Sequence, residues 1–269
     1  MEEEKKVKVG WATIQGNKER AKKIFELILK PEDDDFDVTE MEPGQFVCLV
    51  LLAAVSVMAR PFSVSMISTS HGTFSILYRV VGENTRLMSQ LKINDQIKFW
   101  GPLGQGLIPP EPDGYDEVWL VGGGIGIAPL RFFEKVVAEY QEGIVRVFYG
   151  NKTKAEIVPL YCQEVNEVAT DDGSAGYHGL VTDLFIQNLI TSRPEKLLVV
   201  TCGPIPMMKK VAAVCSQQKV DCYVILEKIM ACGMGVCLGC SVKMKSGMKR
   251  ICHDGPVFPA EEVIWDELA

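Results

Sequence analysis

The sequence predicts a multidomain α+β protein in which an antiparallel β-barrel is followed by an α/β domain with a parallel sheet and by a small C-terminal module. Three observations support this fold class: short strand-like segments early in the chain, alternating strand and helix signals after them, and closely spaced cysteines near the end. A chain of 269 residues is long for one domain and suits two domains with an appendage. We expect the limits to be residues 1–110, 111–226 and 227–269.

Composition narrows the range of partners and locations. A net charge of −7 argues against nucleic acid or an anionic membrane as a partner. The longest apolar run, residues 46–59, is too short to span a bilayer as a helix, and the first residues lack the apolar core of a secretory signal. Nine cysteines without such a signal indicate a reducing cytoplasmic location, where clustered cysteines bind metal rather than form disulfides.

The N-terminal part of the chain is rich in short segments of β-branched and aromatic residues. Turn residues such as Gly, Asp and Asn separate these segments, a pattern typical of a small antiparallel barrel. The expected strands are residues 22–30, 45–52, 61–67, 73–81 and 96–100. A change of pattern around the prolines marks the boundary to the next domain at residues 109–112.

Beyond this boundary, strand and helix signals alternate, which predicts a parallel sheet covered by helices on both faces. Strands are expected at residues 117–121, 145–149 and 196–201, and residues 164–169 precede a polar loop. Helices are expected at residues 129–140, 181–190 and 206–218. From about residue 227 the sequence becomes rich in Cys, Gly and Met, which indicates a third module folded around a metal.

Four cysteines of this last module have the spacing C-x4-C-x2-C-x11-C, and they are Cys232, Cys237, Cys240 and Cys252. The first three match the plant-type [2Fe–2S] ligand pattern. Gly233 and Gly235 in the first gap allow the backbone to wrap closely around a cluster and to direct N–H groups at the sulfurs. A structural zinc also takes four thiolates, but zinc ribbons usually carry two C-x2-C pairs and this module has one. The spacing therefore favours the iron–sulfur cluster.

A glycine-rich turn follows the strand expected at residues 117–121, and its glycines are Gly122, Gly123, Gly124 and Gly126. Pro129 suits the first turn of the helix that comes next. The turn does not match G-x-G-x-x-G, yet glycines allow a phosphate to approach closely and a helix N-terminus offers unpaired N–H donors. Asn151 and Lys152 stand where an acidic residue usually selects NAD, so NAD and NADP both remain open. A plain glycine-rich turn is the alternative.

Two segments of the barrel carry residues suited to a nucleotide cofactor. Arg60 opens one expected strand and is followed by Pro61, Phe62 and Ser63. The next strand and its turn contain Leu77, Tyr78, Arg79, Asn84 and Thr85. An arginine and a threonine hydroxyl near a glycine turn can bind a pyrophosphate, while an aromatic ring and a serine can contact a planar ring system. The alternative is an edge-strand arginine next to a core phenylalanine.

The order of these motifs resembles the ferredoxin–NADP reductase superfamily, with R-x-[YF]-S in the barrel, a G-G-x-G-x-x-P turn, and then Cys202, Gly203 and Pro204. The tail is similar, more narrowly, to the electron-transfer subunits of class 1B dihydroorotate dehydrogenases, as is the run from Asp171 to Ser174. The resemblance covers nearly the whole chain. It implies FAD in the barrel, NAD(H) in the parallel-sheet domain and a [2Fe–2S] cluster on the four cysteines.

The resemblance also implies roles for single residues. Arg60 and Thr85 would hold the FAD phosphates, and Ser63 would contact the isoalloxazine ring. Cys202 would end a strand that faces the nicotinamide. The residues expected to flank the flavin nucleotide are Tyr78 and Arg79. No Ser/His/Asp or paired-carboxylate arrangement stands out, as expected where cofactors supply the chemistry.

Together these features predict an electron relay. NADH would give a hydride to FAD, and single electrons would leave through the cluster. The resemblance implies that they pass to the FMN of a separate dihydroorotate dehydrogenase catalytic subunit in pyrimidine biosynthesis, within a heterotetramer of two copies of each chain. One alternative is the same relay with a hydrogenase or ferredoxin-linked acceptor. Another is a non-catalytic binding module with a structural zinc. The apolar run 46–59 is expected to be either a buried loop under the barrel or part of the docking surface for the catalytic subunit.

Overall fold

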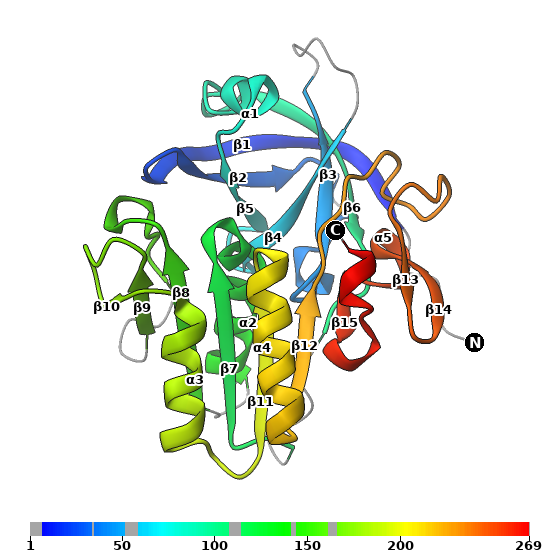
Figure 1. Ribbon diagram of the computed structural model, residues 1–269. Coiled ribbons are helices and arrows are strands. Elements are labelled where there is room, and N and C mark those ends of the chain that lie inside the picture. Colours follow the sequence, from blue (N-terminus) through cyan, green and yellow to red (C-terminus); the bar gives the residue numbers. More distant parts are fainter. Residues whose placement is uncertain are drawn as a thin grey trace.

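Six strands at the start of the chain close into an antiparallel barrel, as the sequence predicts (Figure 1). The structure is a computed structural model that describes residues 7–33, 35–51, 59–107, 114–140, 144–160 and 166–268. Around the barrel the strands follow the order β1-β2-β5-β4-β3-β6. They are β1 (Lys8–Ala21), β2 (Ile24–Pro31), β3 (Phe46–Val50), β4 (Arg60–Ser68), β5 (Thr73–Arg79) and β6 (Gln96–Leu103). A short helix, α1 (Glu83–Met88), follows β5.

The long first strand, β1, is the barrel strand that the sequence pattern did not indicate. Only Ala12 and Ile14 of its fourteen residues are buried, so the alternation that marks a strand is confined to its middle. Pairing of β1 with both β2 and β6 closes the barrel. The expected domain boundary at residues 109–112 and residues 52–58 of the apolar run lie outside the described residues.

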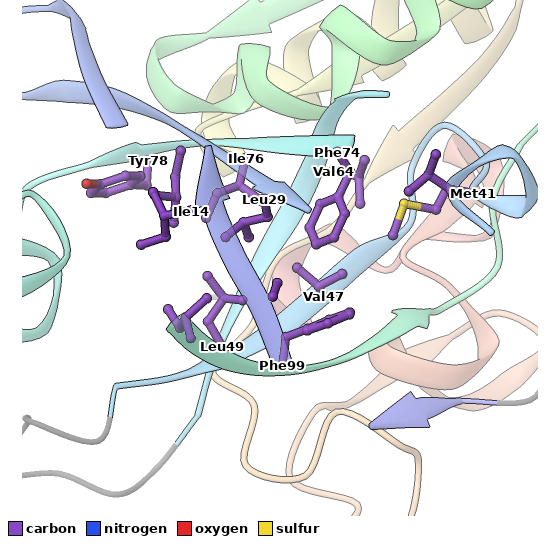
Figure 2. Close-up of a cluster of buried hydrophobic side chains, with 14 of the residues drawn as sticks. Ile14, Leu29, Met41, Val47, Leu49, Val64, Phe74, Ile76, Tyr78 and Phe99 are labelled. Atoms are coloured by element: carbon purple, nitrogen blue, oxygen red, sulfur yellow. The ribbon is translucent and has the colours of Figure 1, made fainter. Parts of the chain in front are cut away.

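Large apolar side chains fill the interior of the barrel because successive residues of a strand point to opposite faces. Figure 2 shows Leu29, Val47, Phe74 and Phe99 gathered in this interior. The rings of Phe74 and Phe99 lie with their centroids 5.6 Å apart. Complete burial of a side chain of this size contributes about 1.5–3 kcal/mol to stability. The packed core therefore holds the barrel strands, and the residues on their outer face, in fixed positions.

The second half of the chain forms a seven-stranded sheet with the order β10-β9-β8-β7-β11-β12-β15. All of these strands run parallel except β15, which pairs antiparallel with β12. They are β7 (Glu117–Gly123), β8 (Ile144–Asn151), β9 (Asn166–Thr170), β10 (Tyr177–His178), β11 (Leu197–Cys202), β12 (Asp221–Ile225) and β15 (Val257–Pro259). The predicted parallel sheet is confirmed, while β9, β10, β12 and β15 are additional short strands.

Helices cover both faces of the sheet, as predicted, and they are α2 (Ile127–Tyr140), α3 (Val181–Ser192) and α4 (Ile205–Gln218). In Figure 1, α3 and α4 lie in front of the sheet and α2 lies behind it. On the front face, Phe185 of α3 and Val211 of α4 pack against Trp119 and Phe148 of the sheet. This arrangement leaves the carboxyl ends of the parallel strands facing the barrel.

Helix α2 lies between the sheet and the barrel and joins the two domains. Phe133 packs with the sheet strands, whereas Phe132 packs with the barrel core. The buried guanidinium of Arg131 donates hydrogen bonds to Glu26 Oε1 at 2.8 Å and to Ser65 Oγ at 3.1 Å, both on the barrel. Because breaking a buried ion pair leaves an uncompensated charge, this contact resists separation of the domains.

The C-terminal module is a small hairpin and helix attached to the edge of the sheet. It contains β13 (Ser241–Met244), β14 (Gly247–Arg250) and α5 (Ile251–Asp254). In Figure 1 the orange segment that leaves β12 runs along the barrel before it reaches this module. Since β15 belongs to the large sheet, the module is fixed to the second domain by a strand pairing. Among the described residues, no helix is both long and apolar enough to cross a membrane.

Candidate functional site

A cavity of about 780 Å³, here called the barrel cavity, lies where the barrel meets the parallel-sheet domain. Its volume is within the range usual for small-molecule sites. One wall comes from β4 and β5, and the opposite wall includes residues 225–230, which lead from β12 to the cysteine-rich loop. Most residues expected to bind FAD line it: Arg60, Pro61, Phe62, Ser63, Leu77, Tyr78, Arg79 and Thr85. Asn84 lines an adjoining cavity of about 490 Å³.

Arg60 and Phe62 show how β4 distributes its side chains between cavity and core. Arg60 begins β4, lines both the barrel cavity and the smaller one, and donates through Nη1 to the carbonyl of Ala59 at 3.3 Å. The planar guanidinium carries several N–H donors, a geometry that matches phosphate oxygens. Phe62 meets Tyr78 edge-on, with ring centroids 6.1 Å apart, so its ring borders the barrel core as well as the cavity.

The hydroxyl groups of Tyr78 and Thr85 are already used by the fold. Tyr78 is buried in the barrel core (Figure 2), where its hydroxyl donates to Asn17 Oδ1 at 3.1 Å and burial raises its pKa well above the ordinary value. Thr85 Oγ1 accepts hydrogen bonds from the N–H groups of Val81 and Gly82, at 3.0 and 3.1 Å, and donates to the carbonyl of Gly82. Both residues therefore shape the cavity wall rather than offer a free hydroxyl to it.

A second cavity of about 780 Å³, here called the sheet cavity, lies over the carboxyl ends of the parallel strands. The glycine-rich turn after β7 and the turn after β11 form its floor, through Gly123, Gly124, Gly126, Gly203 and Pro204. A Cβ atom at Gly126 would lie 2.4 Å from the carbonyl oxygen of Cys202, so only glycine allows these two turns to touch. Helix α2 begins directly after the glycine-rich turn. The unpaired N–H groups at a helix N-terminus are suited to bind a pyrophosphate.

The two cavities share a boundary at which ionised side chains gather. Arg79 and Glu227 line both cavities. Arg79 Nη1 donates to Glu156 Oε2 at 2.9 Å, an ion pair that joins the barrel to the second domain. Glu227 is exposed to water, but the walls of the two cavities surround it closely enough that desolvation raises the pKa of its carboxyl. A ligand in one cavity thus lies next to a ligand in the other.

The four cysteines predicted as cluster ligands come together in the C-terminal module. Backbone N–H groups of the loop point at their sulfurs: Met234 N lies 3.4 Å from Cys232 Sγ, and Gly235 N lies 3.1 Å from Cys252 Sγ. The glycines of the loop, Gly233 and Gly235, have φ values of +71° and +78°, which side chains strongly disfavour. The wrapped backbone that the sequence predicts is therefore present.

The sulfurs form two pairs. The thiol of Cys232 interacts with that of Cys237, and the thiol of Cys240 interacts with that of Cys252. Burial opposes ionisation of Cys232, but N–H donors of Cys237 and Met234 lower the pKa of its thiol to about 7. Among the described residues, no group of three or more His, Cys, Asp or Glu side chains is close enough together to hold a single metal ion. Four thiolates can bind a [2Fe–2S] cluster, with two on each iron, or a single zinc ion.

Arg250 holds the loop in this shape. Its Nε and Nη2 each donate to the carboxylate of Asp254 at 3.1 Å, and its Nη1 donates to the carbonyl of Gly235 at 3.1 Å. Such a two-pronged arginine–carboxylate contact fixes orientation as well as distance. The loop that carries Cys232 is thereby tied to α5, which carries Cys252.

Comparison with known proteins follows the same division into three parts. The Oxidoreductase FAD-binding domain matches residues 19–106, the Oxidoreductase NAD-binding domain matches residues 120–213, and the Iron-sulfur cluster binding domain of dihydroorotate dehydrogenase B matches residues 227–264. The dihydroorotate dehydrogenase B (NAD(+)) electron transfer subunit of Clostridium acetobutylicum is 37% identical over 251 residues, which cover 91% of this chain and 97% of the relative. This chain belongs to the family of dihydroorotate dehydrogenase B electron transfer subunits.

Other relatives agree with this family. The electron transfer subunit of Bacillus velezensis is 33% identical over 258 residues, covering 93% of this chain and 97% of the relative. The solved structure of the NADH-dependent reduced ferredoxin-NADP oxidoreductase matches with a TM-score of 0.83 and 32% identity, covering 96% of this chain and 91% of that one. The ferredoxin reductase of carbazole 1,9a-dioxygenase, at 18% identity and a TM-score of 0.66, shares the fold. The predicted family and cofactor set are confirmed.

Three residues predicted to bind NAD do not line the sheet cavity. Gly122 and Pro129 are buried below its floor, and Cys202 is completely buried at the end of β11. Burial raises the pKa of the Cys202 thiol well above its ordinary value, so this side chain stays neutral. These residues support the two turns, while the neighbouring glycines form the surface that a ligand meets.

Three polar residues that were not predicted as NAD contacts also line the sheet cavity. Asn151 ends β8, Asp171 follows β9 and Thr182 lies in the first turn of α3, and all three line the cavity. The sequence pattern could have indicated two of them. Ligands bind outside the carboxyl ends of parallel strands, and Asn151 and Asp171 lie at such ends. Thr182 had no comparable signal, since its place depends on how α3 packs.

Proposed function

We propose that this chain passes electrons between NAD(H) and the FMN of a dihydroorotate dehydrogenase catalytic subunit in pyrimidine biosynthesis, through FAD and a [2Fe–2S] cluster. One observation carries the proposal: residues 227–230 line the barrel cavity and lead directly to Cys232, while Glu227 also lines the sheet cavity. The three sites are therefore consecutive neighbours. When bound, FAD supplies two-electron hydride chemistry with NADH together with one-electron release, and the cluster carries one electron at a time.

The residues of this chain would hold the cofactors as follows, with domain limits at residues 1–110, 111–226 and 227–269. FAD contacts come from Arg60, Pro61, Phe62, Ser63, Leu77, Tyr78, Arg79, Asn84 and Thr85, of which Tyr78 and Thr85 contribute through their backbone. NAD(H) contacts come from Gly123, Gly124, Gly126, Gly203 and Pro204, supported from below by Gly122, Pro129 and Cys202. The cluster ligands are Cys232, Cys237, Cys240 and Cys252.

The surface around the cluster loop supplies the docking face for the catalytic subunit in this proposal. Ile229, Val236 and Leu238 are 89%, 78% and 61% exposed, although they are large apolar side chains, and Cys237 between them is exposed as well. Exposed apolar patches of this kind are typical of interaction sites. Docking here would bring the partner's FMN next to the cluster, in a heterotetramer of two copies of each chain.

The decisive experiment mixes the purified chain with an FMN-bearing dihydroorotate dehydrogenase subunit. Alone, the chain should reduce artificial one-electron acceptors with NADH and leave dihydroorotate untouched. The mixture should co-elute as a larger complex and couple dihydroorotate oxidation to NAD⁺ reduction. A matched Val236→Asp variant should bind its cofactors normally and fail to co-elute. If the wild-type mixture shows neither co-elution nor coupled activity, the proposed acceptor is wrong.

A second candidate is the same relay with a ferredoxin-linked acceptor. It is favoured by the 32% identity to the structure of the NADH-dependent reduced ferredoxin-NADP oxidoreductase, whose chain this one matches over 91% of its length. The same experiment decides between the two, because a ferredoxin-linked chain would transfer electrons to or from ferredoxin and would ignore the dihydroorotate dehydrogenase subunit. The 37% identity to a dihydroorotate dehydrogenase B subunit puts the first candidate ahead.

The cysteines also bear on where the protein works. We propose a cytoplasmic location, because every cysteine in the described part of the chain is unpaired, including buried Cys48, Cys202 and Cys215. Free thiols in this number are typical of a reducing compartment. Fractionation of cells that produce the protein would test this location.

A further inference from the structure

The cluster loop, which begins at Cys232, enters a niche on the outside of the barrel. A Cβ atom added to Gly233 would lie 2.8 Å from Cys48 Sγ and 3.2 Å from Leu103 Cδ1. The indole Nε1 of Trp100 would be 3.6 Å from the same atom. Cys48 of β3 is paired with Trp100 of β6 in the barrel, so the niche belongs to two neighbouring strands. The loop therefore meets the barrel at one glycine.

Strand β3 explains why Cys48 faces this loop. Successive residues of a strand point to opposite faces. Val47 and Leu49 belong to the barrel core, whereas Phe46 and Cys48 belong to a second apolar cluster that contains two of the ligand cysteines. Cys48 is only 1% exposed. Its side chain thus fills the space between the barrel and the cluster loop.

The same face of β3 also reaches the barrel cavity. Phe46 lines that cavity and comes two positions before Cys48 on the strand. Residues two positions apart on a strand point the same way and lie about 7 Å apart. Strand β3 is held on both sides, by β4 and by β6. Phe46, Cys48 and Gly233 therefore form a row of fixed length from the wall of the barrel cavity to the cluster loop.

The small size of both partners allows this close contact. Burial, and after it the nearby thiols of Cys252 and Cys232, raises the pKa of the Cys48 thiol to about 12, so this thiol stays neutral. A neutral buried cysteine behaves as a small apolar side chain. Gly233 has a φ of +71° and no side chain, which lets the loop approach the sulfur. In a closely packed interior, one additional methyl group at such a contact forces the neighbours to move.

We infer that Cys48 and Gly233 are positioning residues, whose contact sets the distance between the barrel cavity and the cluster loop and thereby the rate of electron transfer between the two cofactors. Each transfer moves one electron from reduced FAD to the cluster, which accepts one at a time. In enzymes, a misplacement of about 1 Å can reduce a rate about a hundredfold. This inference rests on the proposed function, because it concerns the step between FAD and the cluster.

The experiment changes the size of one partner at a time. Gly233→Ala adds a methyl group against the sulfur, and Cys48→Ala removes the sulfur. After the chain loaded with FAD and the cluster is mixed with NADH, stopped-flow absorbance follows flavin reduction and cluster reduction separately. Gly233→Ala should leave flavin reduction unchanged and slow cluster reduction about tenfold or more. Combining Cys48→Ala with Gly233→Ala should recover most of this loss, because the added methyl group then has room.

Gly235→Ala is the matched control for backbone strain. Gly235 lies in the same loop with a φ of +78°, but a Cβ atom added there would meet His253 at 3.0 Å rather than Cys48. The two alanine substitutions therefore impose a similar conformational cost on the backbone. Cys48→Ala should not rescue Gly235→Ala. Rescue of both glycine variants to the same extent, or of neither, would overturn the inference.

Iron loss to a chelator gives a readout that does not depend on electron flow. Gly233→Ala should lose iron faster than the wild-type protein, and Cys48→Ala should reverse this effect as well. Cys48→Ala alone should keep its cluster, and loss of the cluster from this variant would show that Cys48 is a ligand and would contradict the inference.

Cys48→Leu covers the case in which Gly233→Ala assembles no cluster. It enlarges the other partner of the contact, and it should also slow cluster reduction while flavin reduction stays unchanged. A normal rate of cluster reduction in Cys48→Leu would overturn the inference. All of these measurements use the chain without a catalytic subunit. A failure of the proposed acceptor therefore leaves their outcome unaffected, and a failure here leaves the acceptor open.

Discussion

The indole Nε1 of Trp100 donates a hydrogen bond of 3.2 Å to the backbone carbonyl of Cys232. Trp100 belongs to β6 of the barrel, and Cys232 is the first cysteine of the cluster loop. Beside this bond, a Cβ atom added to Gly233 would lie 2.8 Å from the sulfur of Cys48, which is buried on β3. The cluster loop is therefore fastened directly to the barrel that provides the flavin site.

Trp100→Phe should weaken this attachment without destroying the fold. Loss of one such hydrogen bond costs about 0.5–1.5 kcal/mol, so we expect the cluster to be retained but to lose iron faster in a chelator assay. Trp11→Phe is a suitable control, because Trp11 is 38% exposed on β1 of the same barrel. Equal rates of iron loss for the two variants would show that the hydrogen bond does not support the cluster.

Replacement of any of the cluster cysteines, for example Cys237→Ser, should remove the cluster. A thiolate is the ligand that iron–sulfur clusters require, so visible absorbance from the cluster and bound iron should both fall close to zero. Cys215→Ala changes a buried cysteine of the sheet core and should keep both signals. Wild-type protein prepared without oxygen that contained stoichiometric zinc and no iron would contradict the assignment.

Arg60→Ala should weaken FAD binding. A charge-assisted contact to a phosphate contributes about 1.5–3 kcal/mol, which corresponds to roughly a tenfold to hundredfold loss of affinity. Flavin fluorescence released on dilution measures this loss. Arg86→Ala is the control, since Arg86 is exposed on α1 and pairs with Glu83 at 3.7 Å. Full FAD occupancy of the Arg60 variant in dilute solution would mean that another residue holds the phosphates.

Gly124→Leu should block the dinucleotide and spare the flavin. Gly124 lines the sheet cavity with φ at +57°, and the nearest atom to an added Cβ is Asn151 Oδ1 at 4.0 Å, so the new side chain would occupy the cavity itself. We expect the KM for NADH to rise about tenfold or more while the spectrum of bound FAD stays unchanged. Gly10→Leu, on an open part of β1, is the control. Loss of FAD from a folded Gly124 variant would contradict separate sites.

Several features were predictable from the sequence because local physics determines them. The spacing of Cys232, Cys237 and Cys240 and the glycines between them allow only a tightly wrapped loop, and that loop is present. Alternating strand and helix signals required a parallel sheet, because parallel strands need crossover connections. The family resemblance, read from these motifs in their order, is confirmed by the relatives.

Tertiary structure alone decided which predicted residues face a ligand. Tyr78 and Thr85 were expected at the flavin nucleotide, but pairing of barrel strands buries one hydroxyl against Asn17 and the turn after β5 uses the other. Cys202 was expected to face the nicotinamide, yet the close approach of Gly126 covers it from above. A hydrogen bond between residues far apart in the chain leaves no periodic pattern in the sequence. The burial of these side chains therefore becomes visible only in the folded structure.

The same reasoning explains the polar end of the sheet cavity. Asn151 and Asp171 are separated by twenty positions, and they meet because β8 and β9 are adjacent parallel strands that end at the same edge. By itself, the sequence determined the three-part fold, the wrapped cysteine-rich loop and the glycine-rich turn, since each depends on residues close together in the chain. The folded structure decided how the cavities join and which polar groups line them, because both depend on contacts between segments that only the tertiary fold brings together.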